Sequence, residues 1–223
     1  MRKSLGIIAA AATIALMGSA YAADLTVGMS SEPNSMDPHY HNLSPNNMLS
    51  AAVFDKLVLQ DEVQNKVPGL AESWKQLAPD TWQFNLRKGV KWHDGSPFTA
   101  ADVAFTIGRA GNVPNSPSSF GLYTKVIKDV EIVDDYTVNL KTDGPFPLMV
   151  DYMSGFCIVS KKAGEGATTN DYNSGKAMNG TGPYKFVEWV PGDHITYERN
   201  DDYWGEKPEW DKVTVKPITN GSA

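Results

Sequence analysis

The sequence predicts a mixed α/β fold, in which short antiparallel strands are interspersed with a few helices. Two observations predict it. Several short segments alternate apolar and polar side chains, which is the pattern of a strand buried on one face only. Other segments repeat apolar residues at helical spacing instead. No internal repeat or low-complexity tract interrupts this pattern.

The first predicted element is a strand at residues 24–29, DLTVGM, where polar and apolar residues alternate. A polar loop rich in Pro, Asn and Ser follows at residues 30–45. Residues 46–54 then show the helical spacing of apolar residues, and Ser44 or Asn46 is expected to cap that helix.

A short strand is expected at residues 55–60, and the clearest strand of the chain at residues 81–87, TWQFNLR. In the latter, Trp82, Phe84 and Leu86 alternate with polar residues, so one face of the strand is expected to be buried and the other exposed to solvent.

A histidine directly before an aspartate, His93-Asp94, raises the question of a hydrolase active site. Consecutive residues of an extended chain point to opposite faces, so these two side chains diverge. Asp94-Gly95 favours a tight turn, and Thr99 with Asp102 forms a capping box that opens a helix. The pair is therefore interpreted as architecture.

The remaining elements follow in order. That capped helix is expected at 99–110 and another at 146–153, with a hairpin at 126–141 between them that turns at Asp134-Asp135. In its first strand, Val126, Lys128, Val130 and Ile132 are expected to share one face.

Near the end of the chain, the Gly-rich residues 163–182 are polar and are the best candidate for a linker or domain boundary. A second hairpin is expected at 183–200, where Pro191-Gly192 suits a type II turn. A last strand is expected at 211–218.

Residues 1–22 are expected to be a secretory signal peptide, with a short basic head, an apolar run and Ala-Tyr-Ala before the cleavage site. Without Arg2 and Lys3 the formal charge falls from −6 to −8, which argues against nucleic acid and anionic lipid as partners. Cys157 is the single cysteine, so an internal disulfide is excluded, and its apolar neighbours predict a buried thiol. An exported protein of this kind fits the periplasm.

Two long blocks make the sequence recognisable. Residues 69–107 contain Leu-Ala-Glu-Ser-Trp, Leu-Arg-Lys-Gly-Val, Asp-Gly and Thr-Ala-x-Asp-Val in order, and residues 180–208 contain Gly-Thr-Gly-Pro-Tyr and Arg-Asn-x-x-Tyr-Trp. A shorter signature, SMDPHY, follows the first strand. These motifs resemble the family 5 extracellular solute-binding proteins of ABC transporters, which bind dipeptides, oligopeptides or nickel.

The resemblance implies a type II periplasmic-binding-protein-like fold, in which a lobe with a mixed sheet carries an inserted small α+β domain. Members of the family are normally more than twice this long, so the second lobe is expected to be absent here. The implied division after the signal peptide is first-lobe strand and cleft loop at 23–45, inserted domain at 46–165 and return to the first lobe at 166–223.

The resemblance also implies a ligand site. In the family, the loop after Asp-Pro runs along the cleft between the lobes and meets the ligand through backbone and small polar groups. This places Asn42, Leu43 and Ser44 at the ligand, with an ordinary polar loop as the alternative. Phe120 is placed near the cleft, with a core position as its alternative.

No cofactor, metal or catalytic residue is expected. His39 and His41 could share one face, but a closed metal site needs about four ligands, and His93 and His194 lie in patterned strand regions. Gly-x-Ser-x-Gly, His-Glu-x-x-His and Ser-x-x-Lys are all absent from the sequence.

The function implied is therefore not enzymatic. It is that of the periplasmic solute-binding component of an ABC importer, which captures a short peptide or a similar extended solute and delivers it to the membrane permease as a monomer. An opine, a sugar or a chelated metal remains an alternative ligand, and a secreted hydrolase is the alternative from another class.

Overall fold

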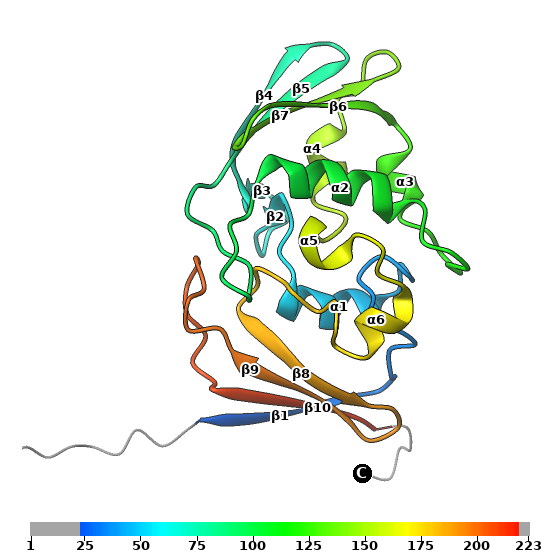
Figure 1. Cartoon of the computed structure of the whole chain (residues 1–223), viewed down its shortest axis with the longest axis vertical. Coiled ribbons are helices and arrows are strands. Elements are labelled where there is room, and N and C mark those ends of the chain that lie inside the picture. Colours follow the sequence, from blue (N-terminus) through cyan, green and yellow to red (C-terminus); the bar gives the residue numbers. More distant parts are fainter. Residues whose placement is uncertain (1–22, 219–223) are drawn as a thin grey trace, which may run out of the picture.

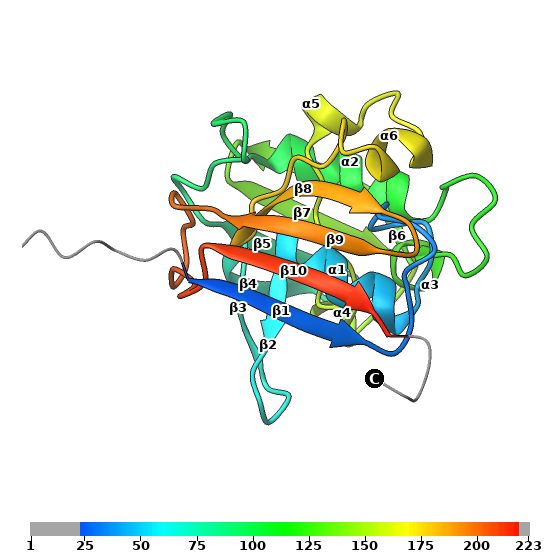
Figure 2. The same cartoon turned by 90° about the horizontal axis from the view of Figure 1, so that it is seen from below.

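A computed structural model describes residues 23–218, which form two four-stranded sheets, a two-stranded ribbon and the helices that join them (Figure 1). The first sheet is mixed and has the order β1-β10-β9-β8. Strand β1 (Asp24–Met29) pairs in parallel with β10 (Lys212–Pro217), whereas β9 (His194–Arg199) and β8 (Tyr184–Val190) continue it antiparallel. The two ends of the described chain thus lie side by side (Figure 2).

The second sheet is antiparallel throughout and has the order β4-β5-β7-β6. Its strands are β4 (Ala71–Ala78), β5 (Thr81–Leu86), β7 (Thr137–Thr142) and β6 (Ile127–Asp134). A small ribbon of β2 (Val58–Gln60) and β3 (Lys66–Pro68) precedes it.

Within residues 23–218, six helices lie between and around the sheets (Figure 1). The two long ones are α1 (Ser44–Val53), which packs against the first sheet beside β8, and α2 (Ala100–Ala110), which packs against the second sheet beside β6. The short ones are α3 (Gly121–Thr124), α4 (Met149–Met153), α5 (Lys161–Gly164) and α6 (Thr169–Asn173).

Each sheet has its own hydrophobic core. The core of the second sheet includes Phe84, Leu86, Val103, Val138 and Leu140. The core of the first sheet includes side chains from α1 together with Cys157, Tyr172, Ile195 and Tyr197. Packing thus groups α1 with the first sheet; the domain limits at residues 46 and 165 stay a prediction.

The mixed α/β fold is confirmed, and with it most of the predicted elements. The turn at Pro191-Gly192 has the geometry expected of type II, with Gly192 at φ +79° and a hydrogen bond from the Asp193 N–H to the Val190 carbonyl (3.0 Å). The first hairpin turns at Asp134, whose carboxylate accepts the Tyr136 N–H at 2.7 Å.

Three expectations were wrong in detail. In β6, Val130 and Ile132 share one face as expected, opposite Leu140 and Val138, but a register shift between Ile127 and Asp129 takes Lys128 out of this alternation, Val126 lies before the strand, and Ile132 is 48% exposed. Helix α1 begins one residue after Leu43, which occupies the cap position in place of Ser44 or Asn46. Strands β3 and β4 were not anticipated.

The Gly-rich residues 163–182 are also not a linker. They include α6, and Tyr172, Ala177 and Met178 are buried in the first core. Gly180 lies so close to α1 that a Cβ atom there would stand 1.8 Å from the Val53 carbonyl oxygen. The glycines of this segment permit close backbone contact, which their composition alone does not distinguish from flexibility.

Candidate functional site

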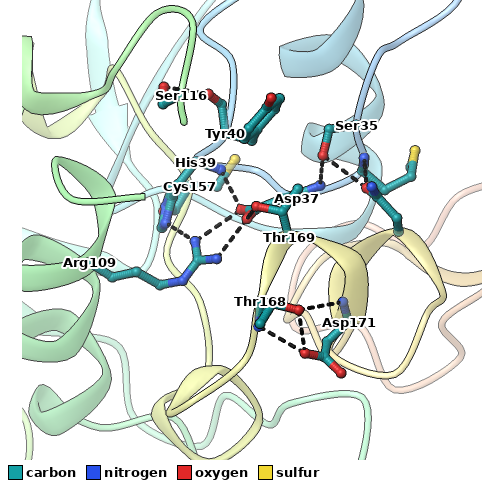
Figure 3. A network of polar contacts seen from close by, with 12 residues as sticks. Ser35, Asp37, His39, Tyr40, Arg109, Ser116, Cys157, Thr168, Thr169 and Asp171 are labelled. Atoms are coloured by element: carbon teal, nitrogen blue, oxygen red, sulfur yellow. Dashed lines mark hydrogen bonds and ion pairs between the residues drawn. The ribbon is translucent and has the colours of Figure 1, made fainter. Parts of the chain in front are cut away.

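A buried ion pair fixes the loop that follows β1 (Figure 3). Arg109, near the end of α2, donates from Nη2 to Asp37 Oδ2 (2.7 Å) and from Nη1 to Asp37 Oδ1 (3.0 Å). The Asp37 side chain is fully buried, and Thr169 of α6 donates a further hydrogen bond to it (2.9 Å). One carboxylate therefore ties the loop to α2 and α6 together.

The electrostatics of this network suit a permanent charge on Asp37. Burial by itself would raise the pKa of Asp37, but the hydrogen bonds and positive charge of Arg109 outweigh it and hold the pKa below its usual value. Burial, reinforced by the charge of Arg109, lowers the pKa of His39 to about 4.

His39 is consequently neutral and fully engaged. An arginine can only donate, so Nδ1 of His39 accepts from Arg109 (2.9 Å) and Nε2 carries the proton that it donates to the Cys157 carbonyl (2.8 Å). Both ring nitrogens are used inside the protein. The residues between 23 and 218 contain no cluster of His, Cys, Asp and Glu that could hold a metal ion.

Beyond this anchor, the predicted ligand loop runs beside a second loop. His41 and Ser118 form a parallel bridge, in which the Asn42 N–H donates to the Ser118 carbonyl at 2.9 Å. Ser116 Oγ donates to the Tyr40 carbonyl next to it. Two extended segments from distant parts of the sequence are thus held together.

The three predicted ligand residues differ in their exposure. Asn42 is half-buried, and its side-chain oxygen accepts a hydrogen bond from Asn47 (2.8 Å). Leu43 is 41% exposed, although it is apolar, and Ser44 is exposed at the first position of α1. The apolar side chain of Leu43 at the N-cap position accepts no hydrogen bond, so α1 begins without a side-chain cap from that residue.

Phe120 lies apart from them. It is 1% exposed and packs in the second core, edge-on to His39 with ring centroids 5.9 Å apart and near Tyr123. This is the core position that was the alternative to a place at the cleft. From this position Phe120 packs against His39 and so connects the second loop to the first.

The histidine of the His93-Asp94 pair is occupied by backbone. Its Nδ1 accepts the Gly180 N–H (3.3 Å), so Nε2 bears the proton that it donates to the Gly182 carbonyl (3.0 Å). Burial lowers its pKa to about 4. Asp94 points elsewhere and binds Ser96 and Lys162. The predicted capping box is present as well, since the Asp102 carboxylate accepts the Thr99 N–H at 2.9 Å.

The two motifs of the second block that carries the family resemblance, Gly-Thr-Gly-Pro-Tyr and Arg-Asn-x-x-Tyr-Trp, meet at Asp55, just after α1. Its carboxylate accepts hydrogen bonds from Thr181 (2.9 Å), Tyr203 (3.3 Å) and Trp204 (2.7 Å). Burial raises the pKa of Asp55, partly offset by these three donors. The second block therefore has a structural role here, because its side chains bind the carboxylate that follows α1.

Cys157 is buried, and burial raises its pKa to about 12, which makes its thiol unreactive.

Sequence reasoning missed Arg109 and Ser118. Nothing in the pattern of α2 marks Arg109, because a charged residue on a helix normally faces solvent. Within the described residues, no helix is long and apolar enough to cross a bilayer.

Comparison with known proteins places this geometry in a family. Residues 65–223 match the family model described as bacterial extracellular solute-binding proteins, family 5 Middle. The glutathione-binding protein GsiB of Pectobacterium atrosepticum is 30% identical over 97% of this chain and 42% of its own length.

Two solved structures extend the comparison. The oligopeptide-binding protein AppA of Bacillus subtilis, in complex with a nonapeptide, has a TM-score of 0.76 at 32% identity, covering 87% of this chain and 40% of that one. NikZ of Campylobacter jejuni, in complex with Ni(L-His), has a TM-score of 0.78 at 30% identity, covering 87% of this chain and 39% of that one.

The chain spans less than half the length of these relatives. Over that span it reproduces their fold, that of the type II periplasmic binding proteins, and its match to the family covers more than half of its own residues. The chain belongs to the bacterial extracellular solute-binding proteins, family 5.

Proposed function

We propose that this chain forms the N-terminal part of the solute-binding component of an ABC importer, which captures short peptides and hands them to a membrane permease. The proposal rests on the family, whose members are binding proteins, and on the paired loops at His41 and Ser118. It includes export by residues 1–22, which lie outside the described residues, action as a monomer in the periplasm, and the absence of catalysis.

The paired loops suit an extended ligand. A peptide can add to an exposed edge of extended chain, where main-chain hydrogen bonds give affinity without selecting side chains. In this proposal the peptide lies along Asn42 and Leu43 up to Ser44 at the start of α1, and the exposed Leu43 offers an apolar contact. The ion pair of Asp37 with Arg109 holds this edge in place before a ligand arrives, which lowers the entropic cost of binding.

Titration of the ¹⁵N-labelled chain with tri-alanine tests the site. We expect saturable shifts at the amides of residues 41–44 and 118–119, and we expect Leu43→Glu to weaken binding by about tenfold, since it replaces an apolar contact by a charge. Leu77→Glu is the matched control, because Leu77 is a similarly exposed leucine (49%) on the second sheet.

Equal effects of the two substitutions, or shifts located elsewhere, would contradict the site. Hydrolysis of the peptide during the titration would contradict the binding function itself and favour the hydrolase. The occupied ring of His93 and the buried thiol of Cys157 support the expectation that no turnover occurs.

A further inference from the structure

A second candidate site is a cavity of about 820 Å³ beside α2. It lies between the C-terminal half of that helix, the loop at residues 112–115 and residues 164–173. Small-molecule sites in proteins occupy about 300–1,000 Å³. Tyr40 lines it, but Asn42, Leu43 and Ser44 do not, so it is separate from the proposed peptide edge.

The lining provides no free charge. Arg109 is the only charged residue among the lining residues, and both of its terminal nitrogens are bound to Asp37 and His39, as Figure 3 shows. A charged ligand would lose its hydration in this cavity without gaining an unsatisfied counter-charge. The cavity therefore favours an uncharged ligand.

Side-chain amides dominate the polar part of the lining. Five asparagines contribute to it: Asn34, Asn112, Asn115, Asn170 and Asn173.

Three of these asparagines are exposed at the mouth of the cavity, and their amides have hydrogen-bonding capacity that either water or a ligand can use. Among the described residues, the side chains of Asn115 and Asn170 make no hydrogen bond, and Asn112 uses only Nδ2, which donates to the Gly108 carbonyl (2.8 Å). An amide offers a donor and an acceptor side by side, which matches a hydroxyl group or another amide. Thr168 adds a hydroxyl at the same rim.

The rest of the lining is apolar, from Ala104, Phe105, Val113, Pro114 and Ala167. Gly164 forms part of this wall, and a Cβ atom there would stand 2.8 Å from Phe105 and 2.9 Å from the Tyr172 hydroxyl. That hydroxyl is buried and has no hydrogen-bond partner within residues 23–218. An unused donor thus lies directly behind the wall.

We infer that this cavity binds an uncharged sugar ring that carries an N-acetyl group. Such a ligand presents hydroxyl and amide groups to the asparagines, while its methyl group and the C–H face of its ring meet Phe105 and Val113. A free peptide fits less well, because both of its charged ends would enter a lining without available charges. The inference does not depend on the peptide edge.

The test is a titration of the ¹⁵N-labelled chain with N-acetylglucosamine, followed through the side-chain amides. We expect saturable shifts at Asn112, Asn115 and Asn170. Asn170→Ala should weaken binding about 3- to 10-fold, the effect of losing one hydrogen bond. Asn85→Ala is the control, since Asn85 is an asparagine on the second sheet that bonds only Ser73.

Thermal unfolding of the Asn170→Ala variant should match that of the parent, which separates lost binding from lost folding. Binding of the sugar that is unchanged in Leu43→Glu would support a site separate from the peptide edge. The inference is overturned if about 50 mM sugar gives no saturable shift, since even a binding free energy of about −2 kcal/mol would then fill half the sites. It is equally overturned if tri-alanine displaces the sugar or shifts the same three amides.

Discussion

Replacing Arg109 by Met removes the guanidinium from a fully buried carboxylate while keeping an unbranched apolar side chain of comparable length. Asp37 would keep its hydrogen bonds from Thr169 (2.9 Å) and from the His39 N–H (3.0 Å), but no positive charge would remain beside it. Its burial would persist, because the Asp37 side chain is 0% exposed in the parent.

The expected cost follows from that geometry. Removing one partner of a buried ion pair destabilises a protein by about 3–5 kcal/mol, because an uncompensated charge remains. In a chain of this size each kcal/mol lowers the melting temperature by about 2–4 °C, so a decrease of about 6–20 °C is expected at pH 7. The stability of a typical domain is about 5–15 kcal/mol, so a loss of this size is a large fraction of it and is measurable by thermal unfolding.

The pH dependence gives a sharper test. In the parent, Arg109 holds the pKa of Asp37 below its usual value; without it, burial alone would raise that pKa above the value in the unfolded chain. A carboxyl with a raised pKa in the folded state destabilises the fold at high pH and less so as it becomes protonated. The difference in stability between variant and parent should therefore shrink as the pH falls from 7 towards 5.

The assay is thermal unfolding followed by circular dichroism at several pH values. The double variant Asp37→Asn with Arg109→Met should recover more than half of the lost stability, because no buried charge is then left. A melting temperature within about 2 °C of the parent at pH 7, or a loss that grows as the pH falls, would refute the reasoning.

Three further predictions concern other parts of the fold. Gly180→Ala should lower the free energy of unfolding by about 3 kcal/mol, because the added Cβ atom would stand 1.8 Å from the Val53 carbonyl oxygen. Gly108→Ala, where a Cβ atom would have no neighbour within 4 Å, should instead raise the free energy of unfolding by up to about 1 kcal/mol. Urea unfolding measures both changes. Cys157 should resist iodoacetamide at pH 8 in the native chain and react in denaturant, and rapid native labelling would contradict its burial. Buried His93 should contribute a loss of up to about 3 kcal/mol in the free energy of unfolding as the pH drops from about 6.5 to about 4, because the unfolded chain takes up a proton that the folded chain does not; His39 adds to the same dependence, and His93→Gln should remove only the contribution of His93.

Local patterns predicted the elements wherever a single residue type or period decides the geometry. The alternation of Trp82, Phe84 and Leu86 gives β5, and the Thr99–Asp102 capping box gives the start of α2. These signals act over a few residues and need no knowledge of the rest of the chain. Strand β4 escaped prediction because its side chains are mostly exposed and leave no clear period.

For the candidate site, the sequence indicated the loop through its resemblance to a family, and the structure supplied the neighbours. No local sequence pattern predicts that the Asn42 N–H donates to the Ser118 carbonyl, because the two residues meet only after α1, the second sheet and α2 have folded. Phe120 shows the same limit, since the sequence left it open between the cleft and the core, and only its packing on His39 shows that it is buried.

By itself the sequence determined the fold class, the family and the structural role of the His93-Asp94 turn, because each depends on short-range stereochemistry or on motifs in a fixed order. Only the tertiary structure decided that Arg109 enters the interior, that the Gly-rich segment is packed, and that a cavity opens beside α2. The physical reason is that burial is a property of contacts between distant segments: whether a charge, a glycine or an asparagine faces water or protein is set by what folds against it.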